Sequence, residues 1–245
     1  MKIDNNIHKL KEIIDNSNNI VFFGGAGVST ESGIPDFRSK DGLYNQCYKY
    51  PPEMIISHSF FMKNTVEFYK FYREKMNCLK YEPNITHKYL VKLENEGKLN
   101  AIITQNIDGL HQKAGSKNVL ELHGSVLRNY CMKCNKFYDS ETVFFSSNTV
   151  PHCQCGGIIK PDVVLYEEEL NEEILREAIE RILKADCLII GGTSLSVYPA
   201  AGLIKYYNGN KLVLINKDET VFDYKANLCI HSSLGKIFDM LQKCK

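Results

Sequence analysis

The sequence has no apolar stretch long enough to cross a bilayer. Its longest apolar runs, residues 20–23 and 187–190, fall far short of the roughly 20 residues that a membrane-spanning helix needs. The first 19 residues mix lysine and aspartate with apolar residues at helical spacing, and they lack the continuous apolar core of a signal peptide. We therefore expect an amphipathic helix at the N-terminus, no membrane partner and a cytoplasmic protein.

The sequence also lacks an excess of charge of either sign. Its 30 basic and 29 acidic residues give a formal net charge of +1, and the basic residues are scattered instead of clustered. Nucleic acids and anionic membranes attract basic patches, so this balance argues against both kinds of partner. There is no internal repeat or low-complexity tract. With 245 residues, 44% hydrophobic and 24% charged, the chain is typical of a soluble globular protein with one large domain and a smaller appendage.

Four of the nine cysteines lie close together. Cys131 and Cys134 are separated by two residues, and Cys153 and Cys155, which follow 18 residues later, by one. Two close pairs of this kind are typical of a zinc ion bound by four thiolates. Such a site has no open position for water and does not need the neighbouring His152, so we expect one structural Zn²⁺. Two disulfides are the alternative, which a reducing cytoplasm disfavours.

Helices and strands alternate along most of the sequence. Short apolar runs predict buried strands, and the segments between several of them have helical periodicity with capping residues at their ends. This alternation predicts an α/β fold with a Rossmann-like, doubly wound parallel sheet and helices on both faces. The predicted strands are residues 20–23, 101–104, 187–190 and 212–215, and the predicted helices are residues 85–96, 172–184 and 199–207.

Two segments break this alternation and have the character of insertions. Residues 40–77 are rich in aromatics and have helical spacing without a strand, while residues 125–157 form a zinc-ribbon insertion that contains the cysteines. We expect the two to form a smaller lobe, with a ligand bound in the cleft between the lobes. The large Rossmann-like domain would then comprise residues 1–39, 78–124 and 158–245.

The first predicted strand runs into a glycine-rich turn, GGAG at residues 24–27. Free backbone N–H groups at the start of a following helix can bind a pyrophosphate, which suits a dinucleotide. An ordinary dehydrogenase fits poorly, because Thr30 stands at the third glycine of G-x-G-x-x-G and no strand ending in an acidic residue follows about 20 residues later. The alternative is a turn that only packs a helix closely on the sheet.

Polar side chains follow two further apolar runs. Gln105, Asn106 and Asp108 come directly after residues 101–104, and His123 follows shortly after the apolar pair at residues 119–120. Open α/β sheets bind ligands at the carboxyl ends of their strands, and histidine, which titrates near neutral pH, suits a general base. A hydrogen-bonded loop that merely ends a strand is the alternative for the first group.

Several motifs, taken together and in order, resemble those of the sirtuin family. They span nearly the whole chain and include the extension of the glycine turn as well as both groups of polar residues. The motifs are GAGVS at residues 25–29, GIPDFR at residues 33–38, TQNIDGLH at residues 104–111, ELHG at residues 121–124 and GGTSL at residues 191–195, with the cysteine cluster between the last two.

The resemblance implies that NAD is a co-substrate. Its pyrophosphate and nicotinamide ribose would lie near Ala26, Thr30, Phe37 and Arg38, with Phe37 shielding the reacting sugar carbon from water and Arg38 pairing with phosphate. By the same resemblance the remaining NAD contacts are Gln105, Asn106, Ile107, Asp108, His123, Thr193, Ser194 and Asn216.

The implied activity is NAD-dependent deacetylation of lysine in proteins or peptides. The carbonyl oxygen of the acetyl-lysine attacks the ribose carbon that bears nicotinamide, and nicotinamide leaves. His123, which with Asn106 forms the catalytic pair, then deprotonates the ribose hydroxyl system so that it attacks the resulting imidate. The expected products are free lysine, nicotinamide and O-acetyl-ADP-ribose, and no serine, cysteine or metal nucleophile is needed.

On the substrate side, Val163, Val164, Leu165 and Tyr166 match the family segment that pairs its backbone with the acyl-lysine peptide. Many relatives have Phe-Gly-Glu where this chain has YEE at residues 166–168. We expect the extra carboxylate to favour basic peptides. Alternatively, the three glutamates at residues 167–169 suit the N-terminus of the helix that follows.

The acyl preference is predicted from a motif that this sequence lacks. Sirtuins that remove succinyl or malonyl groups carry Tyr-x-x-Arg to bind the acyl carboxylate, whereas here Tyr69 is followed three residues later by Tyr72 and Arg73 is one position off. The sequence therefore predicts a preference for acetyl and other neutral acyl groups. Three competing activities stay open at this point: mono-ADP-ribosyl transfer to protein, a zinc-ribbon binding module with a vestigial nucleotide fold, and a Rossmann oxidoreductase.

Overall fold

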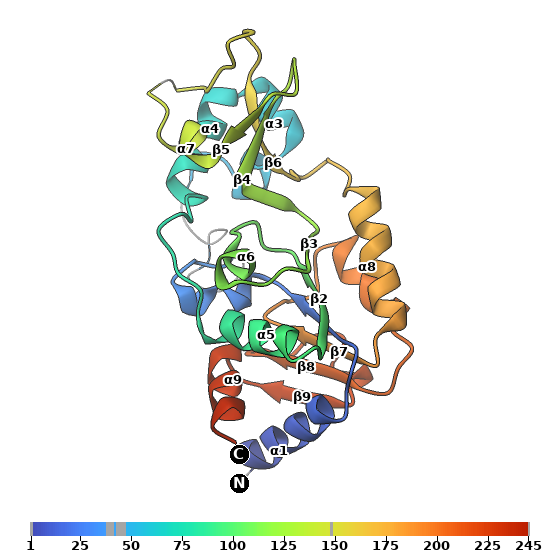
Figure 1. The fold of residues 1–245 in the computed structure, drawn as a ribbon. Coiled ribbons are helices and arrows are strands. Elements are labelled where there is room, and N and C mark those ends of the chain that lie inside the picture. The colour runs from blue at the N-terminus through green and yellow to red at the C-terminus, as the bar shows by residue number, and fades with distance from the viewer. Residues whose placement is uncertain (1, 38–41, 43–47, 148, 245) are drawn as a thin grey trace.

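The large domain is a six-stranded parallel sheet covered by helices on both faces (Figure 1). The computed structural model describes residues 2–37, 42, 48–147 and 149–244. The strand order is β3-β2-β1-β7-β8-β9, and each neighbouring pair is parallel. This is the Rossmann order, so the predicted fold class is confirmed. The strands are β1 (Ile20–Gly24), β2 (Leu99–Thr104), β3 (Val119–Glu121), β7 (Cys187–Gly191), β8 (Leu212–Asn216) and β9 (Leu228–His231).

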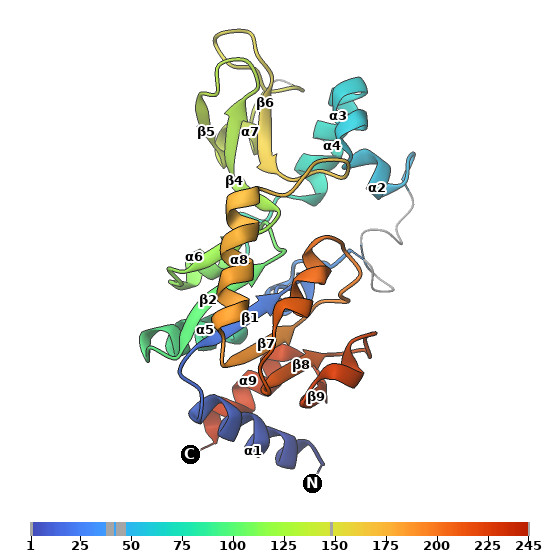
Figure 2. The same cartoon turned by 90° about the vertical axis from the view of Figure 1, so that its right-hand side faces the viewer.

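The helices bury the two faces of this sheet separately. Successive residues of a strand point to opposite faces, so Phe22 of β1 packs in one core while Phe23 packs in the other. The first core also takes Leu10 of α1, Leu90 of α5 and Phe238 of α9, and in Figures 1 and 2 α8 lies on the other side of the sheet from α5. The helices are α1 (Lys2–Asp15), α5 (Ile85–Asn95), α6 (Leu110–Ala114), α8 (Glu172–Lys184) and α9 (Leu234–Lys243).

Two predicted helices adopt a tighter geometry. The segment after the glycine turn forms two short 3₁₀ helices, η1 (Ala26–Val28) and η2 (Thr30–Ser32), instead of starting an α-helix. It ends at Gly33, whose φ of 92° lies in the left-handed region and stops further helical growth. The segment predicted as residues 199–207 is the 3₁₀ helix η4 (Ala200–Tyr206), and another such element, η5 (Asp223–Lys225), follows.

A smaller lobe contains the described parts of residues 48–77 and 125–157 and also β6, which follows them in the sequence. It combines the three-stranded sheet β5-β4-β6 with short helices, and Phe68 and Tyr72 from the first insertion stack with Phe144 from the second in one hydrophobic core. The lobe lies above the parallel sheet in Figure 2. Its elements are α2 (Pro52–Ile55), α3 (His58–Lys63), α4 (Thr65–Lys75), β4 (Gly124–Cys131), β5 (Phe137–Asp139), α7 (Ser140–Phe144) and β6 (Ile159–Val163).

None of the helices in the described ranges combines the length and the apolar character that a membrane span requires.

Candidate active site

The glycine-rich turn lies where the strand order reverses, between β1 and β7. The backbone N–H of Gly27 donates to the carbonyl oxygen of Gly192 over 2.8 Å, and a Cβ atom added to Gly27 would lie 2.6 Å from the Cα atom of Gly192. A side chain is therefore excluded at this contact. In open α/β sheets, a switch point of this kind is the place where ligands bind.

A serine joins the glycine turn to the polar residues after β2. The Oγ atom of Ser29 donates to Asp108 Oδ2 over 2.7 Å and accepts from Asn106 Nδ2 over 3.1 Å. Asp108 also accepts from the backbone N–H of Leu110. Burial raises the pKa of the Asp108 carboxyl group, and these two hydrogen bonds oppose that rise. This role of Ser29 could not be predicted from the sequence, because its partner Asp108 lies 79 positions away along the chain.

His123 follows β3 and faces the same group of residues. Its Nδ1 atom lies 2.9 Å from the carbonyl oxygen of Gln105. A carbonyl oxygen only accepts, so Nδ1 carries the proton and Nε2 is the basic nitrogen of the neutral ring. Burial lowers the pKa of His123, and the hydrogen bond to Gln105 opposes that change. The ring is therefore neutral at neutral pH and can accept a proton.

Hydrogen bonds fix Thr193, Ser194 and Asn216, three of the predicted NAD contacts. The side chain of Asn216 accepts from the backbone N–H of Thr193 over 3.0 Å and donates to its carbonyl oxygen over 2.7 Å. Gln105 Nε2 donates to Thr193 Oγ1 over 3.0 Å, while Ser194 hydrogen-bonds Ser196. These bonds fix the loop after β7 against the ends of β2 and β8.

The other predicted NAD contacts lie around this group. Ala26 and Thr30 belong to the two 3₁₀ helices, and Thr30 donates to the carbonyl oxygen of Gly27. Phe37 and Ile107 are half-buried against the core of the smaller lobe. Arg38 lies outside the described residues.

The predicted substrate segment lies directly beside His123. The backbone N–H of Val164 donates to the carbonyl oxygen of His123 over 3.0 Å. Val163 and Leu165 are buried, Val164 is half-buried and Tyr166 is 36% exposed. The segment thus begins at the end of β6 and runs alongside His123, the candidate general base.

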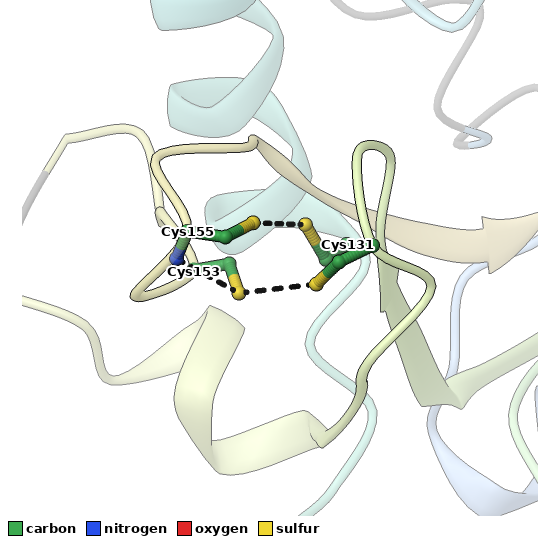
Figure 3. Close-up of side chains that lie close together, drawn as sticks. Cys131, Cys153 and Cys155 are labelled. Atoms are coloured by element: carbon green, nitrogen blue, oxygen red, sulfur yellow. Dashed lines mark hydrogen bonds between the residues drawn. The ribbon is translucent and has the colours of Figure 1, made fainter.

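The four cysteines form a compact cluster in the smaller lobe (Figure 3). All four sulfur atoms lie within 4.8 Å of one another, with 3.4 Å from Cys131 to Cys155 and 3.6 Å from Cys134 to Cys153. Four thiolates around Zn²⁺ at about 2.3 Å place their sulfurs about 3.8 Å apart, and a disulfide needs about 2.05 Å. The cluster fits a zinc ion and not two disulfides. His152 hydrogen-bonds the carbonyl oxygen of Val150 instead.

Fold and site together define a dinucleotide-binding protein of the Rossmann type with an added four-cysteine metal site. The Sir2 family model matches residues 25–199. An NAD-dependent protein deacetylase from Clostridium perfringens is 62% identical over 96% of this chain and 98% of its own length.

Solved structures agree with this match. A Sir2 variant with deacetylated p53 peptide and 3'-O-acetyl ADP ribose has a TM-score of 0.91 and 40% identity, and a Sir2 complex with p53 peptide and NAD⁺ has a TM-score of 0.87 and 40% identity. Each comparison covers 97% of both chains. The chain belongs to the Sir2 family, the sirtuins, as the sequence motifs predicted.

Proposed function

We propose that this chain is an NAD-dependent protein deacetylase that removes acetyl groups from lysine side chains. The relative from Clostridium perfringens carries that name, and the similar Sir2 structures hold a p53 peptide with NAD⁺ or with 3'-O-acetyl ADP ribose. The reaction consumes NAD as a co-substrate together with one solvent water, and gives free lysine, nicotinamide and O-acetyl-ADP-ribose.

The observation that carries the mechanism is the hydrogen bond of His123 Nδ1 to Gln105. It fixes the tautomer in which Nε2 is the acceptor, and burial, which lowers the pKa of His123, keeps that nitrogen unprotonated at neutral pH. NAD, when bound, supplies the ribose carbon and hydroxyl groups that take up the acetyl group. His123 removes a proton from that ribose, and the carbonyl oxygen of the substrate amide serves as the first nucleophile.

The remaining polar residues orient the two substrates. Asn106 and Asp108, held by Ser29, bind the nicotinamide end of NAD and its ribose, which agrees with their position at the strand ends. The glycine turn leaves no room for side chains against Gly192, so only backbone approaches the pyrophosphate there. Val163, Val164, Leu165 and Tyr166 bind the acetyl-lysine peptide beside His123.

The proposed function is accompanied by assignments for the metal, the cellular compartment and the domain limits. Zn²⁺ held by the four cysteines stabilises the smaller lobe and takes no part in the chemistry. Unpaired thiols at this site agree with a reducing compartment, and we place the protein in the cytoplasm. We assign the insertions proposed from the sequence, residues 40–77 and 125–157, to the smaller lobe, and we add β6 to it because β6 pairs with β4.

The proposal is tested by incubating the purified protein with an acetyl-lysine peptide, with and without NAD. Loss of acetyl that requires NAD and equals nicotinamide release supports deacetylation. Nicotinamide release together with a mass gain of ADP-ribose on a protein, without loss of acetyl, would instead identify mono-ADP-ribosyl transfer.

A further inference from the structure

Glu167, directly after the substrate segment, has a backbone conformation that is unfavourable for its residue type. Its φ of 75° lies in the left-handed region, where a Cβ atom crowds the backbone. Glycine, unlike glutamate, adopts such a φ without strain. Something in this chain must therefore compensate for a glutamate here.

The compensation is a contact between Glu167 and the first turn of α3. Glu167 Oε2 accepts from the backbone N–H of Ser59 over 2.8 Å, and Oε1 accepts from Ser59 Oγ over 3.0 Å. Both carboxylate oxygens thus bind one residue of the helical insertion. Hydrogen bonds of this kind, to an ionised acceptor, are the stronger ones in proteins.

The backbone on either side of this contact is paired with the same insertion. The N–H of Tyr166 donates to the carbonyl oxygen of Ile56 over 3.0 Å, and the N–H of His58 donates to the carbonyl oxygen of Tyr166 over 2.9 Å. The substrate segment is therefore held to the start of α3 by two backbone bonds and by the Glu167 carboxylate.

Glu168 also holds the substrate segment in place through its side-chain hydrogen bonds. Its Oε1 lies 2.9 Å from His58 Nδ1, and its Oε2 accepts from Lys160 Nζ over 3.1 Å and from the backbone N–H of Leu165 over 2.9 Å. Neither carboxylate serves the N-terminus of α8, which Asn171 caps. Since both are occupied within the chain, the extra charge is not offered to a basic peptide as the sequence suggested.

We propose that Glu167 is a positioning residue for the acetyl-lysine peptide. By binding Ser59, Glu167 holds the segment Val163–Tyr166 in a fixed position relative to His123. The carbonyl oxygen of His123 accepts a hydrogen bond from the backbone N–H of Val164 in this segment. The backbone edge that binds the peptide is then ordered before the peptide arrives, so less conformational entropy is lost on binding. This inference rests on the proposed deacetylase function and concerns its peptide side only.

The test compares the kinetics of Glu167→Gly with those of the unaltered protein. Glycine keeps the left-handed backbone without strain and removes the carboxylate, so the fold is preserved while the contact to Ser59 is lost. We expect KM for an acetyl-lysine peptide to rise about fivefold, the order of one lost hydrogen bond. The KM for NAD and kcat should stay within about twofold, because the Glu167 carboxylate binds Ser59 and not the described residues predicted to contact NAD.

Two further variants separate positioning from direct peptide contact. Glu167→Gln keeps an acceptor oxygen for Ser59 and should restore a near-normal peptide KM, while Glu169→Gln removes a neighbouring exposed carboxylate and should change nothing. Melting temperatures measured alongside identify any variant that fails to fold, in which case Ser59→Ala, which removes one of the two hydrogen bonds, gives the same test with a smaller expected rise in peptide KM.

Two results would overturn the inference. One is an unchanged peptide KM in folded Glu167→Gly. The other is a KM increase in Glu167→Gln that is confined to basic peptides, because this would mean that the charge meets the peptide directly. A lack of deacetylation in the unaltered protein would instead refute the proposed function, so the two failures are distinguishable.

Discussion

The Nδ1 atom of His123 and the carbonyl oxygen of Gln105 lie 2.9 Å apart, which assigns the proton of the neutral ring to Nδ1. We expect His123→Ala to lower kcat by at least about 100-fold, the usual contribution of a general base. Peptide mass spectrometry after timed reactions measures the loss. The melting temperature of the variant should stay close to normal, and wild-type-like turnover would remove His123 from the mechanism.

The pH dependence of the reaction should reflect the titration of the His123 ring. Burial lowers the pKa of His123 below the ordinary value of 6.5, so the ring loses its proton at a lower pH than an exposed histidine. The base is therefore active above this lowered pKa and is lost as the pH falls through it. We expect the acid limb of kcat/KM, measured from about pH 5 to about pH 8, to lie below pH 6.5. An acid limb above 6.5 would contradict this assignment.

Zinc should be present at one ion per chain and should stabilise the smaller lobe. Cys153 is buried within the cluster, so Cys153→Ser is expected to lose zinc and to lower the melting temperature by several degrees, since each 1 kcal/mol corresponds to about 2–4 °C in a chain of this size. Elemental analysis and thermal unfolding provide the readouts. Cys244→Ser, outside the cluster, is the matched control and should keep its zinc. Freshly purified protein without zinc would refute the site.

The acyl preference follows from how Tyr69 and Arg73 are used. Arg73 Nε donates to the carbonyl oxygen of Val143 over 2.8 Å, and the Tyr69 hydroxyl donates to the carbonyl oxygen of Ile159. Both side chains are committed to the core of the smaller lobe, so a succinyl carboxylate would lose its water without gaining this pair as a partner. We expect succinyl-lysine to be removed at least about tenfold more slowly than acetyl-lysine in matched peptides. Faster desuccinylation would show the inference to be wrong.

The parallel sheet was predictable because its strands are buried on both faces. Such strands read as short continuous apolar runs, and β1, predicted at residues 20–23, is found as Ile20–Gly24. The small sheet gave no such signal: β5 has three residues and is mostly exposed, and β4 mixes apolar with polar residues. The α-helix expected after the glycine turn was wrong, since Gly33 ends that segment within a few residues.

The motifs predict a set of residues for the candidate site but none of the contacts between them. The motifs named Asp108 and His123, yet the bond between Ser29 and Asp108 joins segments 79 positions apart and the bond between Glu167 and Ser59 joins segments 108 positions apart. Spacing along a sequence carries no information on pairs that only tertiary folding brings together. The backbone acceptor of His123, which fixes its tautomer, is hidden for the same reason.

The most direct test of the account is to measure acetyl loss and nicotinamide release together, from one acetyl-lysine peptide, with and without NAD. The account predicts that both occur only with NAD and in equal amounts, and that O-acetyl-ADP-ribose appears with them. Acetyl loss without NAD, or no reaction at all in folded, zinc-containing protein, would contradict it.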